Sequence, residues 1–301
     1  MNPTIQKKIS LIGCPLDMGA SMRGCRLGPE AIRLAGMKKR LENIGYDVVD
    51  CGDVVVKNHL DHERSSENLN HLEEVVEGVK NLTRAVDEEM GKGRFPVVLG
   101  GDHTIAMGTI QGVLHHVQNL GVIWFDAHGD INTNETSPSG NIHGMPVAAL
   151  LGEGDARLVE LGPHRLGVKN LVLVGSRDLD FGEREALKRL GIHVFTMHEI
   201  DAYGVRAVME EALAIATDGT DGIHVSFDMD ILDPEVAPGT GTKVPGGMLY
   251  REAHLCLESV AQTGKLVSCE FVEVNPILDV RNKTAEAAVA LAGSLLGEWL
   301  I

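Results

Sequence analysis

Short apolar segments and longer mixed segments alternate along the whole chain. The short segments are rich in Val, Ile, Leu and Phe and show little alternation between apolar and polar residues. Uninterrupted apolar runs of this length are typical of strands in a parallel sheet that is covered on both faces. The predicted strands are residues 9–13, 47–50, 96–99, 121–125, 170–175, 192–195, 222–228 and 265–274.

The segments between these strands are predicted to be helices. Pro29 stands at the start of one of them, and Gly45, Gly93 and Gly191 follow helix ends, which are the positions these residue types prefer. The predicted helices are residues 29–43, 63–92, 104–119, 182–190, 203–217, 250–262 and 283–299.

The order of these elements predicts the fold class. Strands that alternate with helices indicate βαβ units, and hence a parallel sheet with helices packed on both faces. No Pro/Ser-rich linker, low-complexity tract or repeat divides the chain, so we expect a single domain over residues 1–301. The two longest irregular stretches, residues 129–144 and 230–247, leave the sheet at the carboxyl ends of strands, where open parallel sheets bind ligands. They are the expected substrate loops.

The composition is that of a globular protein with an acidic surface. Hydrophobic residues make up 44% and charged residues 23%, while aromatic residues are only 4%, so the core is expected to be mostly aliphatic. Lys and Arg total 27 against 43 Asp and Glu, which gives a net charge of −16. Such a surface repels phosphate groups, so we expect neither a nucleic acid nor a membrane surface as partner.

The cysteines and the N-terminus favour a cytoplasmic protein. The five cysteines are odd in number, scattered and without a C-x-x-C pair, so they are expected to be free thiols in a reducing compartment. The N-terminus has too short an apolar run for a signal peptide. No stretch approaches the ~18 apolar residues of a membrane helix.

Metal-ligand chemistry follows three of the predicted strands. Asp126, His128 and Asp130 occupy every second position after strand 121–125, so an extended chain would direct all three side chains to one spot. A single D-x-H would more often be an incidental polar strand end. Two other strands end in the same way, and all of these ends belong at one edge of a parallel sheet. The resulting candidate metal ligands are His103, Asp126, His128, Asp130, Asp228 and Asp230.

These ligands predict a pair of divalent cations. Asp126 and Asp228 could each bridge two ions, because a carboxylate has two oxygens. Ligands that are rich in oxygen and free of sulfur suit Mn²⁺ better than Zn²⁺. Two such ions about 3.5–4 Å apart can share a water molecule and lower its pKa, which makes a hydroxide nucleophile available. Two cations, four aspartates and one hydroxide sum to a charge of −1, which tolerates a cationic substrate.

The motifs resemble those of the ureohydrolase (arginase/agmatinase) family, and among its members the bacterial arginases. GGDHT, DAHGDIN, SGNIHGMP, SFDMDILDP and EFVEVNP occur in this order over nearly the whole chain. The resemblance implies a three-layer α/β/α fold around an eight-stranded, mainly parallel sheet. It also implies two Mn²⁺ per subunit. One ion would take His103, Asp126, Asp130 and Asp228, and the other would take Asp126, His128, Asp228 and Asp230.

The resemblance further implies hydrolysis of L-arginine to L-ornithine and urea by a metal-bridging hydroxide. A guanidinium group is always charged and its carbon is a poor electrophile, which explains the need for a strong nucleophile. Glu273 would hold the guanidinium through paired hydrogen bonds. Asp130 would be the first proton carrier, and His143 would shuttle protons to the leaving amine. The family also leads us to expect a homo-oligomer, either a trimer or a hexamer.

The loop of residues 132–143 carries the expected preference for arginine. By the resemblance, its polar residues contact the substrate α-carboxylate, two acidic residues lie near the α-amino group, and a threonine completes the pocket. The alternative is an agmatinase or another guanidino-compound hydrolase, since the preference depends on a few small polar side chains. In that order, the substrate-binding residues are Asn132, Ser137, Ser139, Asn141, Asp180, Glu183 and Thr242.

The chain departs from the family pattern at two positions, and it has several polar residues to which we assign no role in the site. Arg26 and Ile231 replace the residues expected at their positions and could alter loop geometry or subunit contacts. Asp102 is expected to cap the turn after it, since adjacent strand residues point to opposite faces. Glu270 is expected to be structural, and His224 to be packed within its strand.

The motifs disfavour two other classes of function. A binuclear metallophosphoesterase also uses D-x-H, but it needs G-D-x-x-D and G-N-H-[DE] motifs that this chain lacks. A non-enzymatic metal-binding protein predicts broken ligands or the loss of His143 or Glu273, and all of these residues are present.

Overall fold

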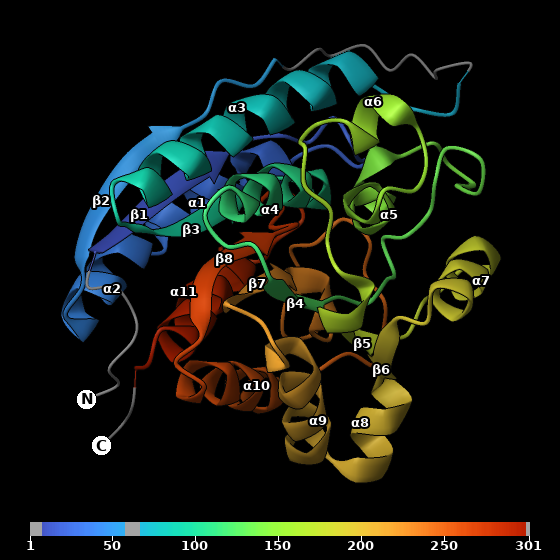
Figure 1. Cartoon of the computed structure of the whole chain (residues 1–301). Helices are drawn as coiled ribbons and strands as arrows, with labels where there is room; N and C mark the ends of the chain where they lie inside the picture. The colour runs from blue at the N-terminus through green and yellow to red at the C-terminus, as the bar shows by residue number, and fades with distance from the viewer. Residues whose placement is uncertain (1–7, 58–66, 299–301) are drawn as a thin grey trace.

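The computed structural model describes residues 8–57 and 67–298. Its centre is one eight-stranded sheet in which every pair of neighbouring strands is parallel, in the order β2-β1-β3-β8-β7-β4-β5-β6. Figure 1 shows the sheet twisting through the middle of the molecule. The strands are β1 (Lys8–Cys14), β2 (Asp47–Asp53), β3 (Phe95–Gly100), β4 (Leu120–Phe125), β5 (Leu171–Ser176), β6 (His193–Thr196), β7 (Gly222–Asp228) and β8 (Leu266–Val272).

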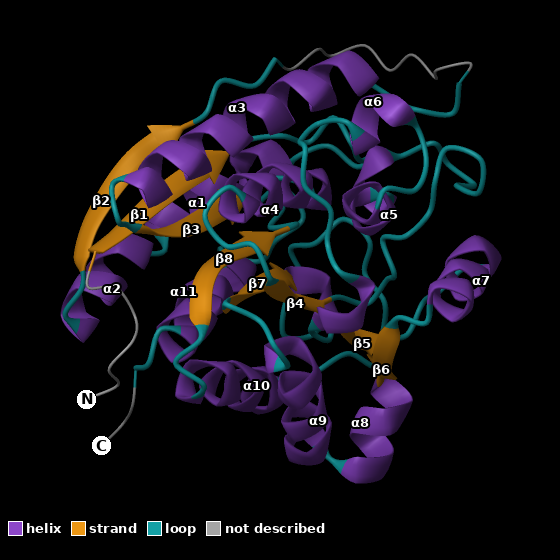
Figure 2. Ribbon diagram, in the orientation of Figure 1, coloured by secondary structure: helices purple, strands orange, loops and turns teal. Residues whose placement is uncertain are grey.

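Helices cover both faces of the sheet, as the sequence predicted, and make three layers (Figure 2). Successive side chains of a strand enter opposite cores: Ile123 and Phe125 pack into one, and Val122 and Trp124 into the other. The first core includes α1 (Gly28–Leu34), α2 (Met37–Ile44), α8 (Met197–Tyr203), α9 (Val205–Thr217), α10 (Tyr250–Gln262) and α11 (Lys283–Leu295). The second includes α3 (Leu72–Gly91), α4 (Ala106–Leu114), α5 (Pro146–Leu151), α6 (Ala156–Val159) and α7 (Phe181–Leu190).

The apolar pattern located the strands well because the central ones are buried on both faces. Every residue of β3, β4, β5 and β7 is buried. The edge strand β2 differs, since only Val48 is buried, and it carries Asp47, Asp50 and Asp53. Charged residues on an edge strand oppose pairing with another chain.

The helix predictions were wrong mainly at internal breaks. The predicted helix 29–43 is two helices, α1 and α2, because Gly36 adopts a left-handed backbone with φ 95°. Helix α8 was missed and is separated from α9 by Gly204. The short helices α5 and α6 were also missed, and α4 ends five residues before the predicted limit of 119. Residues 63–66 and 299 of two predicted helices lie outside the described residues.

Ile231 has a specific place in the fold. Its side chain is fully buried and lies against Gly175, at the end of β5. A Cβ on Gly175 would lie 2.5 Å from Ile231 Cδ1, and the φ of 95° at Gly175 also disfavours a side chain. Ile231 is therefore accommodated because residue 175 is a glycine. Arg26 is only partly buried and lies in the short 3₁₀ helix Cys25–Leu27.

Candidate metal centre and catalytic pocket

The site lies at the carboxyl ends of four strands that are neighbours in the sheet. Strands β3, β8, β7 and β4 lie in this order, so the segments that follow them meet at one edge. His103 and Asp126 follow β3 and β4, Asp228 ends β7, and Glu273 follows β8. Residues separated by up to 170 positions are thereby brought into contact.

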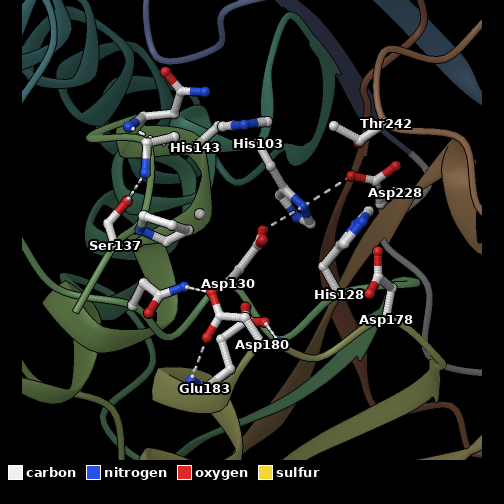
Figure 3. A pocket seen from close by; sticks show the side chains of 15 residues that line it. His103, His128, Asp130, Ser137, His143, Asp178, Asp180, Glu183, Asp228 and Thr242 are labelled. Carbon is white, nitrogen blue, oxygen red and sulfur yellow. Dashed lines mark hydrogen bonds and ion pairs between the residues drawn. The ribbon is translucent and has the colours of Figure 1, made fainter.

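The first ligand group surrounds Nδ1 of His103. This nitrogen lies 3.1 Å from Asp126 Oδ2, 3.0 Å from Asp130 Oδ2 and 3.1 Å from Asp228 Oδ2. In Figure 3 the Asp130 and Asp228 carboxylates both point toward the His103 ring. Yet His103 Nδ1 and Asp130 Oδ2 are buried without a hydrogen-bond partner. An octahedral cation about 2.1 Å from its ligands would hold neighbouring ligand atoms about 3.0 Å apart, so this geometry fits a metal ion.

The second ligand group lies beside the first and shares Asp126 with it. His128 Nδ1 is 3.3 Å from Asp126 Oδ1 and 3.2 Å from Asp230 Oδ2. The two oxygens of Asp126 therefore belong to different groups, His103–Asp126–Asp228 and Asp126–His128–Asp230. The donor sets fit a binuclear metal site in which Asp126 is the shared ligand.

The charges of the cluster support the same conclusion. Burial, and after it the charge of Asp126, raises the pKa of Asp130 to about 7. The pKa of Asp228 is also raised well above its ordinary value, first by burial and then by Asp230 and Asp126. Carboxylates gathered this closely are unfavourable without positive charge between them, and divalent cations would supply it.

The ligands are oriented by hydrogen bonds to the turns that follow the strands. Asp126 Oδ1 accepts the His128 N–H at 2.7 Å, and Asp228 Oδ1 accepts the Asp230 N–H at 2.7 Å. Trp124 Nε1 donates to Asp126 Oδ2, and its ring stacks on His103 with 4.1 Å between centroids. These contacts fix the directions of Asp126, Asp228 and His103 without an ion.

The predicted convergence of Asp126, His128 and Asp130 along an extended strand is wrong. The strand ends at Phe125, so Asp126, His128 and Asp130 do not converge through strand alternation. They converge because the chain turns, and Asp130 adopts a left-handed backbone with φ 51°. Glu273 is also left-handed, with φ 63°. Non-glycine residues held in this region are characteristic of functional sites.

Beneath the metal ligands is a buried polar network. His103 Nε2 contacts Ser226 Oγ at 2.8 Å, and Ser226 donates to Glu270 Oε1 at 2.7 Å. Glu270 and His224 are fully buried, so the expectations of a structural Glu270 and a packed His224 are confirmed. Asp102 Oδ1 accepts the Thr104 N–H at 3.1 Å, which confirms its predicted role as a cap.

A cavity of about 200 Å³ opens above the ligands. The predicted site residues Asp126, Asp230 and Glu273 do not line it, and they lie buried below. Asp178 was not predicted as a site residue, although its position two residues after the end of β5 repeats the strand-end signal seen at the other strands. The lining residues are His103, His128, Asp130, Asn132, Ser137, Pro138, Ser139, Asn141, His143, Gly144, Asp178, Asp180, Glu183, Asp228 and Thr242 (Figure 3).

His143, which lines the cavity, pairs with Glu273 buried beneath it. His143 Nδ1 lies 3.1 Å from Glu273 Oε1, which also accepts the His103 N–H at 2.9 Å, while Cys25 Sγ donates to Glu273 Oε2 at 3.2 Å. Burial disfavours a charge on His143, but Glu273, with Asp102 and Asp130 after it, outweighs burial and raises the pKa of His143 to about 9. Burial alone would raise the pKa of Glu273, but His143 holds it below its ordinary value.

Asp180 and Glu183 join helix α7 to the cavity wall. They form a capping box at the start of α7, and Glu183 Oε1 also accepts the Gly129 N–H at 3.1 Å. Asp180 Oδ2 accepts a hydrogen bond from Asn132 Nδ2 at 2.7 Å. Opposite them, Thr242 donates to the ligand Asp230 at 2.9 Å, so it both lines the cavity and holds a metal ligand.

The serines of the cavity wall are ready to donate hydrogen bonds. Ser137 Oγ accepts the Gly140 N–H at 3.0 Å, and Ser139 Oγ accepts the Asn141 N–H at 3.2 Å. Because each hydroxyl oxygen is already an acceptor, its own proton is left for another group. A negatively charged group in the cavity would accept hydrogen bonds from these hydroxyls.

Comparison with known proteins connects this geometry to one family. A profile of the Arginase family matches residues 7–297. The chain is 54% identical to an arginase of Brevibacillus brevis, over 99% of this chain and 100% of that protein. It superposes on the native structure of an arginase from Bacillus caldovelox with a TM-score of 0.95 and 52% identity, over 98% and 99% of the two chains. Within the described residues, every helix is too short or too polar to cross a membrane.

Proposed function

The chain belongs to the arginase family, and from that premise we propose that it hydrolyses L-arginine to L-ornithine and urea with two Mn²⁺ ions per subunit. The observation that supports this most directly is Asp126, whose two oxygens serve two adjacent ligand groups. When bound, two divalent cations would supply Lewis acidity and a water of lowered pKa. Manganese is proposed because four of the six ligands are carboxylates and none is a thiolate.

The guanidinium group would bind above Glu273. The depressed pKa of Glu273 keeps it ionised, and a carboxylate matches a guanidinium through two parallel hydrogen bonds. The hydrogen bonds from the His103 N–H and from Cys25 hold this carboxylate in place. Its left-handed backbone, with φ 63°, sets the direction of the side chain.

Proton transfer is assigned to Asp130 and His143. Asp130 Oδ2 belongs to the first ligand group, so the second oxygen of this carboxylate would be the one that accepts a proton from the attacking water. His143 lines the cavity and has a pKa of about 9, so it is protonated at neutral pH and can donate to the leaving amine. Glu273 stabilises the charged imidazolium at a distance of 3.1 Å.

The rest of the cavity would recognise the amino-acid end of the substrate. The hydroxyls of Ser137 and Ser139, with the amides of Asn132 and Asn141, would surround the α-carboxylate. Asp180 and Glu183 would lie near the α-ammonium group, and Thr242 would complete the pocket. A carboxylate would satisfy donors that agmatine leaves unpaired, and this difference favours arginine.

The test is urea release from a panel of guanidino compounds with added Mn²⁺, Zn²⁺ or no metal. We expect Mn²⁺-dependent turnover of L-arginine and little turnover of agmatine or guanidinobutyrate. If agmatine is turned over as fast as arginine, the substrate assignment is wrong while the metal site stands. Full activity of the metal-free protein would reject the metal mechanism itself.

We also propose a homo-oligomer, a trimer or a hexamer, in the cytoplasm. Large apolar side chains remain exposed on the single chain, among them Leu34 at 76%, Leu249 at 60% and Phe181 at 74%. Burial of such side chains between subunits would be favourable. Light scattering of the purified protein distinguishes the two assemblies, and a monomer at working concentration would contradict both.

A further inference from the structure

A short segment outside the cavity holds the substrate loop, which we define as residues 132–143. Asn68 Nδ2 donates to the carbonyl oxygens of Asn134 and Ser137, both at 2.8 Å. Asn70 donates from its backbone N–H to the Gly140 carbonyl at 2.9 Å. Neither asparagine lines the cavity, so both contact the loop from outside.

We propose that Asn68 and Asn70 are positioning residues that shape the substrate loop into a carboxylate receptor and thereby determine selectivity for an α-amino acid over its decarboxylated amine. This inference rests on the proposed function of the cavity. Together the two residues, which we call the asparagine clamp, donate five hydrogen bonds to the loop.

The backbone conformation of the clamp is held in place by the surrounding structure. Asn68 has a left-handed φ of 57°, a conformation that asparagine tolerates better than most residues. Leu69, between the two asparagines, is 1% exposed and belongs to one of the hydrophobic cores. The clamp is therefore anchored to the protein interior.

Close contact with Gly140 makes the fit specific. Gly140 has a φ of 74°, and a Cβ there would lie 2.6 Å from Asn68 Oδ1. The same glycine donates its N–H to Ser137 Oγ at 3.0 Å. Displacement of the clamp would therefore change the position of the backbone that orients the Ser137 hydroxyl.

The clamp also sets the orientation of the Asn141 amide. Asn70 Nδ2 donates to Asn141 Oδ1 at 3.2 Å, and Ser21 Oγ donates to the same oxygen at 2.9 Å. With Oδ1 occupied by two donors, the Nδ2 group of Asn141 is the end available to a ligand in the cavity. An amide turned the other way would present an acceptor, which repels a carboxylate.

The principal variant is Asn68→Asp. Aspartate has the same size and also tolerates a left-handed backbone, but it replaces the donor with an oxygen facing two carbonyl oxygens. Asn70→Ala removes the side-chain bonds to Ser139 and Asn141 and leaves the backbone bond intact. The matched control is Asn81→Asp, since Asn81 Nδ2 donates to a backbone carbonyl, that of Val55, away from the loop.

We expect the KM for L-arginine to rise about tenfold in each clamp variant, with kcat nearly unchanged, since one charge-assisted hydrogen bond is misplaced. The KM for agmatine should change less than twofold, and Asn81→Asp should affect neither substrate. An equal rise in the KM of both substrates, or no rise in either, would overturn the proposed role of the clamp. If Asn68→Asp fails to fold, Asn70→Ala alone tests the proposal, by the change in KM for L-arginine relative to the change in KM for agmatine.

A binding measurement separates this inference from the proposed function. Calorimetry would compare L-ornithine with putrescine, which lacks the carboxylate, on the wild-type protein and the variants. Selective weakening of L-ornithine supports the clamp even if the wild type releases no urea from arginine, a result that would reject only the proposed function. Unchanged L-ornithine binding in both clamp variants rejects the clamp even if arginine turnover is confirmed.

Discussion

At the scale of the residue, Asp126 uses both carboxylate oxygens, each in a different ligand group. Its Oδ2 accepts from Trp124 and faces His103, while its Oδ1 accepts from the His128 N–H and faces the His128 ring. The side chain is 1% exposed. No other residue type offers two equivalent anionic oxygens in the same volume.

We predict that Asp126→Asn loses at least one of two bound metal ions and lowers kcat about 10³-fold or more, because one metal-facing oxygen becomes an amide nitrogen. Metal content by mass spectrometry and urea release measure the two effects. Asp201→Asn, an exposed substitution on α8, is the control and should keep both. An active variant with two full sites would refute the shared-ligand assignment.

The His143–Glu273 pair predicts a pH dependence of stability for the metal-free protein. The pKa of His143 is raised to about 9, above the ~6.5 of an unfolded histidine. Its contribution to stability is therefore complete below pH ~6.5 and is lost as the pH rises through about 9. We expect the difference in melting temperature between the wild type and His143→Gln to shrink over this window. A difference that grows with pH would contradict the pairing.

At the scale of the element, the end of β5 and the turn after β7 are fitted to each other. Gly175→Ala would place a Cβ 2.5 Å from Ile231 and impose a side chain at φ 95°. We expect a loss of about 2–4 kcal/mol in the free energy of unfolding. Ile231→Ala alone should cost about 2–5 kcal/mol through the cavity it leaves.

The double variant tests whether the two residues are in contact. Denaturant unfolding should show that Gly175→Ala costs less in the Ile231→Ala background, because the steric part of its cost is relieved. Strict additivity would show that the packing described between Gly175 and Ile231 does not govern this junction.

The sequence predicted elements best where one physical signal dominated. Buried parallel strands such as β4 and β7 appear as uninterrupted apolar runs, so they were located to within about a residue. Breaks such as Gly36 and Gly204 depend on a positive backbone φ. A glycine permits this conformation, but its presence in the sequence does not show that the conformation is adopted. Six metal-ligand candidates were found because they follow strands, but the turn that directs Asp130 into the site could not be seen in a linear pattern.

Contacts between distant segments were the hardest to predict. Asn68 and Asn70 reach the substrate loop across about 70 positions, and neither carries a motif of its own. Asp178 was missed for a different reason, since its strand-end signal was present but was followed only at the other strands.

At the scale of the whole molecule, one sheet joins the first described strand to the last. Strands β1 and β8 pair with the two edges of β3. We therefore predict a single cooperative unfolding transition, consistent with one domain over residues 1–301. Far-ultraviolet circular dichroism and tryptophan fluorescence should give coincident curves. Two separated transitions would indicate two domains.

Metal binding should raise the stability of this whole unit. The crowded carboxylates oppose folding without cations, and ligands that bind only the folded state stabilise it by mass action. We expect Mn²⁺ at 100 times its Kd to increase the free energy of unfolding by about 2.7 kcal/mol. The same titration on Asp126→Asn should give a smaller increase, and an unchanged wild-type melting temperature would contradict the metal site.

The left-handed backbones of Asp130 and Glu273 have a consequence for how this molecule can vary. Each such conformation costs on the order of 1–3 kcal/mol, and here both costs fall on residues assigned to the chemistry. Glycine would remove this backbone cost at either position, but it would also remove a side chain that is assigned to the chemistry. Any attempt to stabilise the protein by consensus or design should therefore exclude residues 130 and 273 from its search.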